Sequence, residues 1–313
     1  GALDDKGAVI AIFEALKKLQ AKGFAPARTV YLAFGSDEEI GGLKGAAAIA
    51  AHLKAQNIQL EFYMDEGGMV SEGLVPNIKR PVALIGTAEK GYITLELTVN
   101  IKGGHSSRPP RQSARDVLNA AVKKLHDSPQ DARTVETVDE FLSLIGPEMP
   151  SPLKMVFANR WLFNPLIVKE YEKSDEGRAL LRTTQVTTVM NAGQKENVIP
   201  SLVSAKVNYR ILNDETAAEV IEWARTVIND TLVKIVPGEV NEPSRNSSSA
   251  TYGFKLIQQT SAQVFPDAIV APFLMLGSTD SKHFQHITDN TYRFLPVRMN
   301  GDQIGLTSCR ESV

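Results

Sequence analysis

The sequence is poor in the features that mark several classes of protein. A single cysteine, Cys309, among 313 residues excludes an intrachain disulfide framework and a zinc site made of cysteines. The 34 basic and 36 acidic residues nearly cancel, giving a net charge of −2. No nucleic-acid partner is expected, because nucleic-acid binders usually carry a concentrated basic face. No apolar run approaches the roughly 18 residues that a membrane span needs.

The start of the chain carries no targeting information. The first residue is Gly1 rather than Met, no signal peptide is recognisable, and the chain begins inside what reads as a motif. We therefore expect a chain that is truncated at this end, and its localisation is unknown.

The first part of the chain alternates helical and β-rich runs. The spacing of apolar residues predicts a helix over 8–19, and an alanine-rich stretch predicts a second one. TVYLAFG at 29–35 and EFYM at 61–64 predict strands, and each is followed by carboxylates and a Gly-Gly pair. This alternating order predicts an α/β domain with a central, largely parallel sheet. Because α/β character resumes near the C-terminus, we assign this domain to residues 1–89 and 243–313.

Between these two parts the pattern becomes that of an α+β domain. YITLELTVNIK, which begins at Tyr92, alternates apolar and polar residues as a half-exposed strand does. Predicted helices at 113–126 and 215–230 alternate with further strands in the order β-α-β-β-α-β, the ferredoxin-like arrangement. We expect an inserted domain over 90–242, itself interrupted by a helical insertion at about 127–182.

Acidic side chains recur where the elements of the first part begin or end. Asp4 precedes the first helix, Glu38 and Glu39 follow the first strand, and Asp65 follows the second. Carboxylates gathered in one cleft repel one another unless a cation neutralises them. Their convergence predicts two divalent metal ions that activate a shared water. Taken singly, Asp4 is also explained as a helix cap, and the DEE and DEG groups as solvated loop surface.

Six motifs together resemble a known enzyme family. They occur in the order GALDDKG, GSDEEIGG, MDEGG, KGGHSSRPP, ENVIPSLVSAKVNYRI and GSTDSKHF. The chain resembles the co-catalytic zinc metallopeptidases of the M20 type, which include carboxypeptidase S, aminoacylase, acetylornithine deacetylase and succinyl-diaminopimelate desuccinylase. ANRWLFNPLI and LLRTT point to the carboxypeptidase S-like branch, which includes the N-fatty-acyl-amino-acid synthase/hydrolases. The resemblance implies a zinc-exopeptidase-like catalytic domain and a ferredoxin-like lid domain through which two copies could dimerise.

The resemblance also implies roles for individual residues. Asp4 matches the carboxylate that bridges two metal ions, expected to be zinc, while Glu39 and Asp65 match ligands of one ion each. Glu38 matches the general base. His105 matches the lid histidine that stabilises the oxyanion, in many members from a partner subunit. The residues expected to contact the substrate are Asn197, Arg210, Gly277, Ser278 and Thr279.

These roles imply a hydrolase that cleaves a peptide or N-acyl amide bond next to a free carboxylate. The expected substrate is a small peptide or an N-acyl amino acid. Arg210 suits its carboxylate because a guanidinium offers a planar pair of donors. Without the family, His105 is also explained as a residue that caps a turn, and Arg210 as half of a surface ion pair.

Two of the family's metal-binding elements have no counterpart in this sequence. The family carries a His-x-Asp pair upstream of GALDDKG and a histidine after the segment that resembles YRFLPV, whereas this chain ends in GDQIGLTSCRESV. We expect these ligands to lie beyond truncations at both ends. The alternative is a non-catalytic binding or assembly protein of the same fold with a degraded metal site. In the insertion, five apolar residues are expected to pack against the lid helices rather than to form a path for an acyl chain: Trp161, Leu162, Phe163, Leu166 and Ile167.

Overall fold

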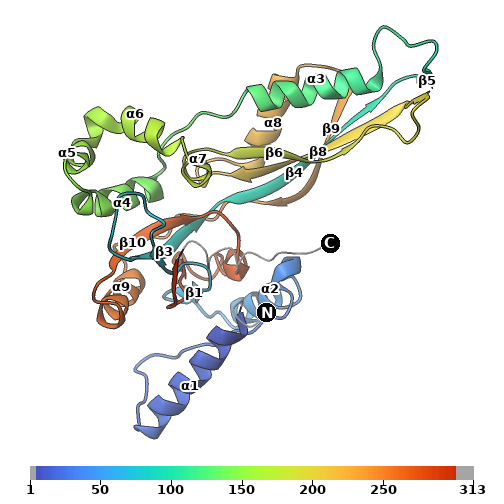
Figure 1. Cartoon of the computed structure of the whole chain (residues 1–313). Helices are drawn as coiled ribbons and strands as arrows, with labels where there is room; N and C mark the ends of the chain where they lie inside the picture. The colour runs from blue at the N-terminus through green and yellow to red at the C-terminus, as the bar shows by residue number, and fades with distance from the viewer. Residues whose placement is uncertain (1–4, 301–313) are drawn as a thin grey trace.

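The computed structural model describes residues 5–300, which form two β-sheets and the helices that cover them (Figure 1). The larger sheet has six strands in the order β1-β11-β3-β2-β12, with β10 paired to β3. Its strands are β1 (Tyr63–Asp65), β2 (Val70–Glu72), β3 (Val82–Glu89), β10 (Ile269–Met275), β11 (Thr291–Arg293) and β12 (Arg298–Asn300). The β1·β11, β3·β10 and β2·β12 pairs are parallel, and β3 is antiparallel to β2 and β11. The predicted α/β fold is confirmed, with a sheet that is mixed.

Strand β3 is the centre of this sheet, and all eight of its residues are buried. One of its faces packs against α4 (Glu136–Ile145), and the other packs against α9 (Tyr252–Val264). A strand that is covered on both faces needs apolar side chains on both, which explains the nearly continuous apolar run VALIGTA.

The second sheet has four antiparallel strands in the order β6-β8-β4-β9. They are β4 (Gly91–Asn100), β6 (Thr184–Asn191), β8 (Leu202–Ile211) and β9 (Val233–Asn241). The helices α3 (Ala114–Asp127) and α8 (Ala217–Ile228) cover one face, where the inward residues of β4 and β8 form a core with them (Figure 1). Buried and half-buried residues alternate along β4, as its sequence predicts. The chain order is the β-α-β-β-α-β order that we predicted.

The predicted helical insertion is present but packs elsewhere than we expected. It contains α4, a short 3₁₀ turn at Gly146–Glu148, α5 (Leu153–Ala158), α6 (Arg160–Tyr171) and α7 (Asp175–Leu181). These helices share a core with β3 and β10 of the six-stranded sheet, not with the helices of the four-stranded sheet. The expectation for the five apolar residues of α6 is therefore wrong. Ile167 is buried in this core, Phe163 is half-buried, and Leu162 and Leu166 are exposed, while Trp161 is 83% exposed.

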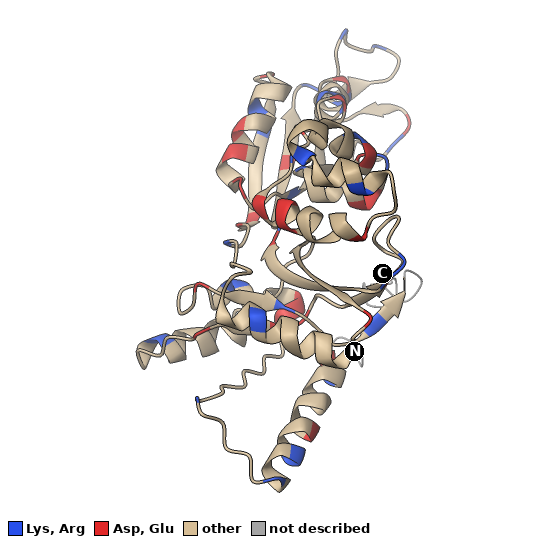
Figure 2. Ribbon diagram, turned by 90° about the vertical axis from the view of Figure 1, so that its left-hand side faces the viewer, with Lys and Arg blue, Asp and Glu red and all other residues tan. Residues whose placement is uncertain are grey.

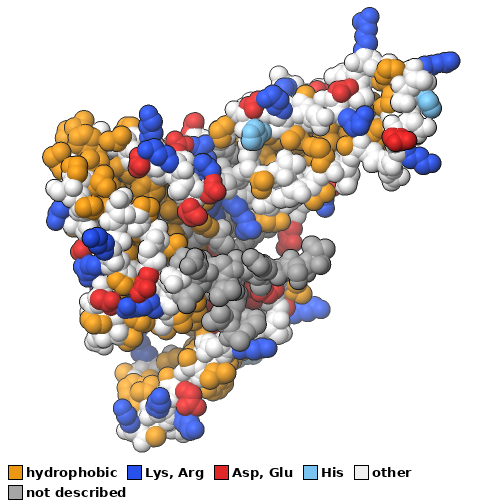
Figure 3. Space-filling view, viewed as in Figure 1, with side chains coloured by type: hydrophobic (Ala, Val, Ile, Leu, Met, Phe, Trp, Pro, Cys, Tyr) orange, Lys and Arg blue, Asp and Glu red, His pale blue; other side chains and the backbone are white. Residues whose placement is uncertain are grey.

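The reason lies in α4, whose apolar stripe already covers β10. Phe141, Leu142 and Ile145 occupy that face, and Phe141 meets Phe273 of β10 edge-on at 5.7 Å between ring centroids. Helix α6 therefore lies outside α4 and reaches the core through Ile167. Figure 3 shows the apolar side chains that gather over α5 and α6 as a result.

The N-terminal segment differs from its prediction. Helix α1 (Gly7–Ala21) forms as expected, but it has no buried residue, and its N-cap Lys6 makes no side-chain cap. Residues 29–35 are not a strand, because none of the strands within residues 5–300 runs beside them to share hydrogen bonds. Phe34 instead stacks on Phe13 at 5.6 Å between ring centroids. Helix α1 projects from the rest of the molecule in both views (Figures 1 and 2), and acidic and basic residues are interspersed over the chain (Figure 2).

The two sheets are joined where β3 ends at Glu89 and β4 begins at Gly91. The chain returns after β9, where Ser244 exchanges backbone and side-chain hydrogen bonds with Glu89. The domain limits predicted at 89/90 and 242/243 stay a prediction. Within residues 5–300, none of the helices is both long and apolar enough to cross a bilayer.

Candidate active site

Three segments that are far apart in the sequence meet beside the six-stranded sheet. They are residues 36–45, the end of β1 at Asp65, and residues 277–284. The imidazole Nε2 of His283 lies 2.8 Å from the carbonyl oxygen of Gly41, which joins the first segment to the third. Tyr63 stacks on Phe284 at 4.0 Å between ring centroids, which joins the second to the third. The motifs GSDEEIGG, MDEGG and GSTDSKHF therefore converge in space.

The loop at 36–45 uses the first of its three consecutive acids to hold its own shape. The two carboxylate oxygens of Asp37 accept hydrogen bonds from the backbone N–H groups of Lys44 and Gly45, at 2.7 and 2.8 Å. Glu38 and Glu39 lie on the 3₁₀ turn Glu38–Ile40, where Glu38 is half-buried and Glu39 is exposed. Asp37 thus fixes the turn that presents the predicted general base and metal ligand.

A glycine allows this loop to approach the third segment closely. Gly42 has a φ of +67°, and a Cβ added there would stand 2.0 Å from Oδ1 of Asp280. No other residue fits that position without moving Asp280 or the backbone. Burial, with a smaller contribution from the neighbouring Asp37, raises the pKa of the Asp280 carboxyl. Oδ1 of Asp280 is buried and has no hydrogen-bond partner.

Asp65 is the carboxylate that is best prepared to receive a cation. Its Oδ1 accepts a hydrogen bond from the backbone N–H of Glu66 at 3.0 Å, while its Oδ2 is buried without a hydrogen-bond partner. Burial raises the pKa of this carboxyl to about 6, partly offset by the Glu66 N–H, and the charge of Glu89 raises it further. A buried carboxylate oxygen that lacks a donor is costly unless a positive charge binds it. Asp65 therefore fits the role of a divalent-metal ligand.

The other predicted metal ligands are Asp4 and Glu39. Asp4 lies outside the described residues. Within residues 5–300, no three His, Cys, Asp or Glu side chains are grouped closely enough to hold a metal ion. Of the predicted ligands, the described residues include Asp65, with its buried Oδ2, and Glu39, on the turn of the first segment.

The predicted substrate loop is held from two sides. Ser278 Oγ accepts a hydrogen bond at 2.7 Å from the side-chain amide of Asn241, at the end of β9. The backbone N–H and the hydroxyl of Thr279 both donate to Oε1 of Glu89, at 2.9 and 2.7 Å. Gly277 is exposed at the start of the loop. The loop is therefore fixed to both sheets.

The predicted site residues of the second sheet lie at its two opposite ends. His105 belongs to β5 (Gly104–His105), which pairs with β7 (Val198–Ile199) at the tip farthest from β1 (Figure 1). The backbone carbonyl of Asn197 accepts a hydrogen bond from Ser106 N–H at the same tip. Both residues are exposed, and Nδ1 of His105 accepts a bond from Ser107 N–H. The structure does not bring His105 or Asn197 to Asp65 of the same chain.

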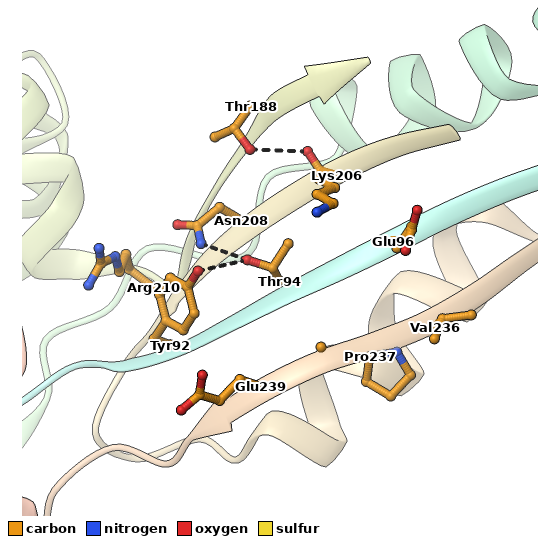
Figure 4. Close-up of a pocket in the computed structure, with 11 residues that line it drawn as sticks. Tyr92, Thr94, Glu96, Thr188, Lys206, Asn208, Arg210, Val236, Pro237 and Glu239 are labelled. Carbon is orange, nitrogen blue, oxygen red and sulfur yellow. Dashed lines mark hydrogen bonds between the residues drawn. The ribbon is translucent and has the colours of Figure 1, made fainter. Parts of the chain in front are cut away.

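Arg210 lies in a groove on the open face of the same sheet. The groove has a volume of about 540 Å³ and is lined by residues of all four strands (Figure 4). The guanidinium of Arg210 lies over the ring of Tyr92, 5.0 Å from its centroid. Along the groove, the Asn208 amide donates to Thr94 Oγ1, and the Thr94 hydroxyl donates to the phenolic oxygen of Tyr92. Arg210 is half-buried and stacked on Tyr92, and within residues 5–300 it forms no ion pair with a carboxylate.

Nearly the whole sequence matches the model of one protein family. The model of peptidase family M20/M25/M40 matches residues 1–304. The chain belongs to this family. The M20 chain is 39% identical over 307 residues to a probable carboxypeptidase S-like 2 of Dictyostelium discoideum, covering 97% of this chain and 59% of the relative. It is also 39% identical over 304 residues to the N-fatty-acyl-amino acid synthase/hydrolase PM20D1 of Mus musculus, covering 96% and 60%.

Solved structures share the fold of this M20 chain. A dipeptidase of Saccharomyces cerevisiae, Dug1p, has a TM-score of 0.57 at 15% identity and covers 97% of this chain and 66% of its own. Human carnosine dipeptidase 1 has a TM-score of 0.55 at 13% identity and covers 94% and 65%. The M20 chain spans about 60% of the length of the curated relatives named above.

Two buried residues of the site were missed from the sequence. Glu89 and Arg293 pair with one another and hold the substrate loop. Glu89 lies in none of the six motifs, and Arg293 lies in the YRFLPV segment, where we gave it no role. A signal was present, because Glu89 ends an otherwise apolar run in a strand whose residues are all buried. His283, which belongs to the motif GSTDSKHF, also contacts the loop at the carbonyl of Gly41.

Proposed function

We propose that the protein is a metal-dependent hydrolase that cleaves a peptide or N-acyl amide bond next to a free carboxylate. The observation that carries this proposal is the buried, unpartnered Oδ2 of Asp65 beside a substrate loop, in a chain of the M20 family. The names of the relatives, a carboxypeptidase S-like protein and an N-fatty-acyl-amino acid synthase/hydrolase, support substrates of this kind.

The metal site is proposed to hold two divalent ions, with zinc as the expected metal. Asp65 and Glu39 would each bind one ion, and Asp4, outside the described residues, would bridge them. Such ions, when bound, polarise the substrate carbonyl and make a water molecule acidic enough to lose its proton near neutral pH. The carboxylate donors of Asp65 and Glu39 suit a divalent cation, and histidine ligands would favour zinc further.

The protein side chains supply proton transfer and substrate binding. Glu38 takes a proton from the attacking water and later gives it to the leaving amine. Arg210 binds the free carboxylate of the substrate, and Gly277, Ser278 and Thr279 line the pocket around the scissile bond. His105 donates to the oxyanion that forms during the attack.

The four-stranded sheet is proposed to act as a lid and a dimerisation domain. His105 and Asn197 lie at its far tip (Figure 1), so a second copy of the chain is a suitable source of these residues for each site. A homodimer through this domain would satisfy that requirement.

The proposal is tested with Glu38→Gln, which keeps the size of the side chain and removes its basicity. We expect the hydrolysis of N-acyl amino acids to fall about 100-fold or more while the metal content is unchanged. Glu61→Gln, a substitution of an exposed glutamate before β1, is the matched control and should keep full activity. Undiminished hydrolysis by Glu38→Gln with metal bound would exclude Glu38 as the base.

Elemental analysis separates the hydrolase from the non-catalytic alternative. Near-stoichiometric divalent metal together with hydrolysis supports the enzyme. Empty metal sites with retained binding of N-acyl amino acids and no turnover support a binding protein of the same fold.

A further inference from the structure

An ion pair is buried at the end of β3, where the two sheets join, and it contacts the substrate loop. Nη2 of Arg293 lies 3.0 Å from Oε2 of Glu89, and the two side chains are 0% and 2% exposed. A buried ion pair is poor evidence of stabilisation, because removing two charges from water costs about as much as their attraction returns. What the pair holds in place is therefore more informative than its own energy.

The pair holds the substrate loop through three donors. Oε1 of Glu89 accepts from the backbone N–H and the hydroxyl of Thr279. Oε2 of Glu89 accepts from the hydroxyl of Ser281 at 3.1 Å. Nε of Arg293 donates to the same Ser281 oxygen at 3.0 Å. Each oxygen of the Glu89 carboxylate thus accepts from two donors. The loop from Thr279 to Ser281 is therefore hydrogen-bonded to a buried, ionised carboxylate.

The other end of the pair is fixed beside Asp65. Arg293 and Asp65 are register partners on the parallel strands β11 and β1, and the backbone N–H of Phe294 donates to the Asp65 carbonyl at 2.8 Å. Nη1 of Arg293 donates to the carbonyl of Thr291 at 2.9 Å, which ties the guanidinium to its own strand. A continuous chain of hydrogen bonds therefore connects the substrate loop to the strand beside the proposed metal ligand.

We propose that Glu89 and Arg293 are positioning residues that set the substrate loop against Asp65. They reach no substrate themselves, since both are buried, and they act through Thr279 and Ser281. This inference rests on the proposed function for its catalytic readout. Loss of the pair is expected to weaken substrate binding while the reacting groups stay in place.

The first test is Glu89→Gln, which keeps the shape but places an amide NH₂ before one set of donors. We expect KM for an N-acyl amino acid to rise about tenfold or more, with kcat changed much less, because a hydrogen bond to a charged group is lost. Ser281→Ala is the second variant, because it removes the Ser281 link between the loop and the pair and leaves both the pair and the Thr279 bonds in place. It keeps the inference testable if Glu89→Gln does not fold.

The double variant Glu89→Gln/Ser281→Ala separates positioning from general destabilisation. If both residues act through one set of contacts, the KM of the double variant should be close to the higher of the two single-variant KM values. Independent effects would instead multiply. Ser71→Ala is the matched control, a buried serine of β2 whose hydroxyl donates to Val82 and touches no part of the loop. Its KM should stay within about twofold of the parent.

Amide hydrogen exchange decides the matter independently of activity. The Thr279 N–H should exchange at least about tenfold faster in Glu89→Gln and in Ser281→Ala than in the parent or in Ser71→Ala. A parent protein without hydrolysis would overturn the proposed function while exchange still tested the positioning role. Unchanged exchange and unchanged KM in both variants, or equal changes in Ser71→Ala, would overturn the inference.

Discussion

Asp65 and Arg293 stand side by side as register partners on β1 and β11, yet they do not form an ion pair. The Arg293 guanidinium donates to Glu89 and Ser281 instead, so the Glu89 carboxylate largely neutralises its charge. Burial therefore dominates at Asp65 and keeps its pKa at about 6. The arrangement leaves a buried carboxylate oxygen available to a cation from outside the chain.

Replacement of Asp65 should weaken metal binding with little damage to the fold. Asp65→Asn keeps the size of the side chain and the bond from Glu66 N–H, but the amide is a weaker ligand for a divalent ion. We expect bound metal to fall below half of the parent's value in elemental analysis after dialysis. Full retention of metal by this variant would show that Asp65 is not a ligand.

Because Gly86 of β3 has no side chain, the Arg293 and Met275 side chains can pack directly against its backbone. A Cβ added at Gly86 would lie 2.6 Å from Cγ of Met275 and 3.0 Å from Cβ of Arg293. Gly86→Ala should therefore lower the free energy of unfolding by about 1–3 kcal/mol, as overpacking does. Gly104→Ala, where nothing lies within 4 Å, should change it by less than about 0.5 kcal/mol. Urea unfolding measures both, and equal midpoints would contradict this reading.

Lys90 should make the stability of the protein depend on pH. Its ammonium is buried between the carbonyls of Ala179 and Arg182, at 2.8 and 2.7 Å, and burial lowers its pKa from 10.5 to about 7. Below pH 7 the lysine is protonated in both states, so the cost of burying its charge is fully present. As pH rises above 7, the folded state releases the proton and the unfolded state keeps it, so the folded state gains stability.

We therefore expect the free energy of unfolding to rise between pH 7 and pH 9, by up to about 1.4 kcal/mol per pH unit. Lys90→Met should lack this rise, which chemical unfolding at both pH values can measure. A parallel rise in both proteins would assign the effect to another group.

Two apolar residues of α6 should differ sharply in their contribution to stability. Ile167 is 4% exposed in the core shared with β10, whereas Trp161 is 83% exposed. Ile167→Ala should cost about 2–5 kcal/mol of unfolding free energy. Trp161→Ala should cost less than about 0.5 kcal/mol, despite the larger side chain that it removes. The opposite order of the two unfolding midpoints would contradict the packing described for α6.

Local patterns predicted the four-stranded sheet well. The alternation in 92–102 fixed which face of β4 is buried, because a strand with one covered face shows a period of two. Helix α3 begins where Ser113 and Asp116 form a capping box, and α8 begins at the same arrangement of Thr216 and Glu219. These signals depend on nearby residues, so they can be recognised in the sequence.

Signals that depend on distant partners were less informative. Residues 29–35 are rich in β-forming side chains, but a strand also needs a neighbour, and residues 5–300 place none beside them. Strand β3 was not predicted, because a short apolar run bounded by charges can also be a buried helix segment. The Glu89–Arg293 pair joins residues 204 positions apart, a contact that no local pattern reveals.

The position of β5 at the outer tip of the four-stranded sheet has a consequence for how the protein would behave on dilution. Strand β5, which contains His105, lies at the outer tip of the four-stranded sheet, away from β1, which ends at Asp65 (Figure 1). If His105 takes part in the reaction, a second copy of the chain supplies it to each site. The rate per chain then falls as the protein concentration drops below the dissociation constant of the dimer.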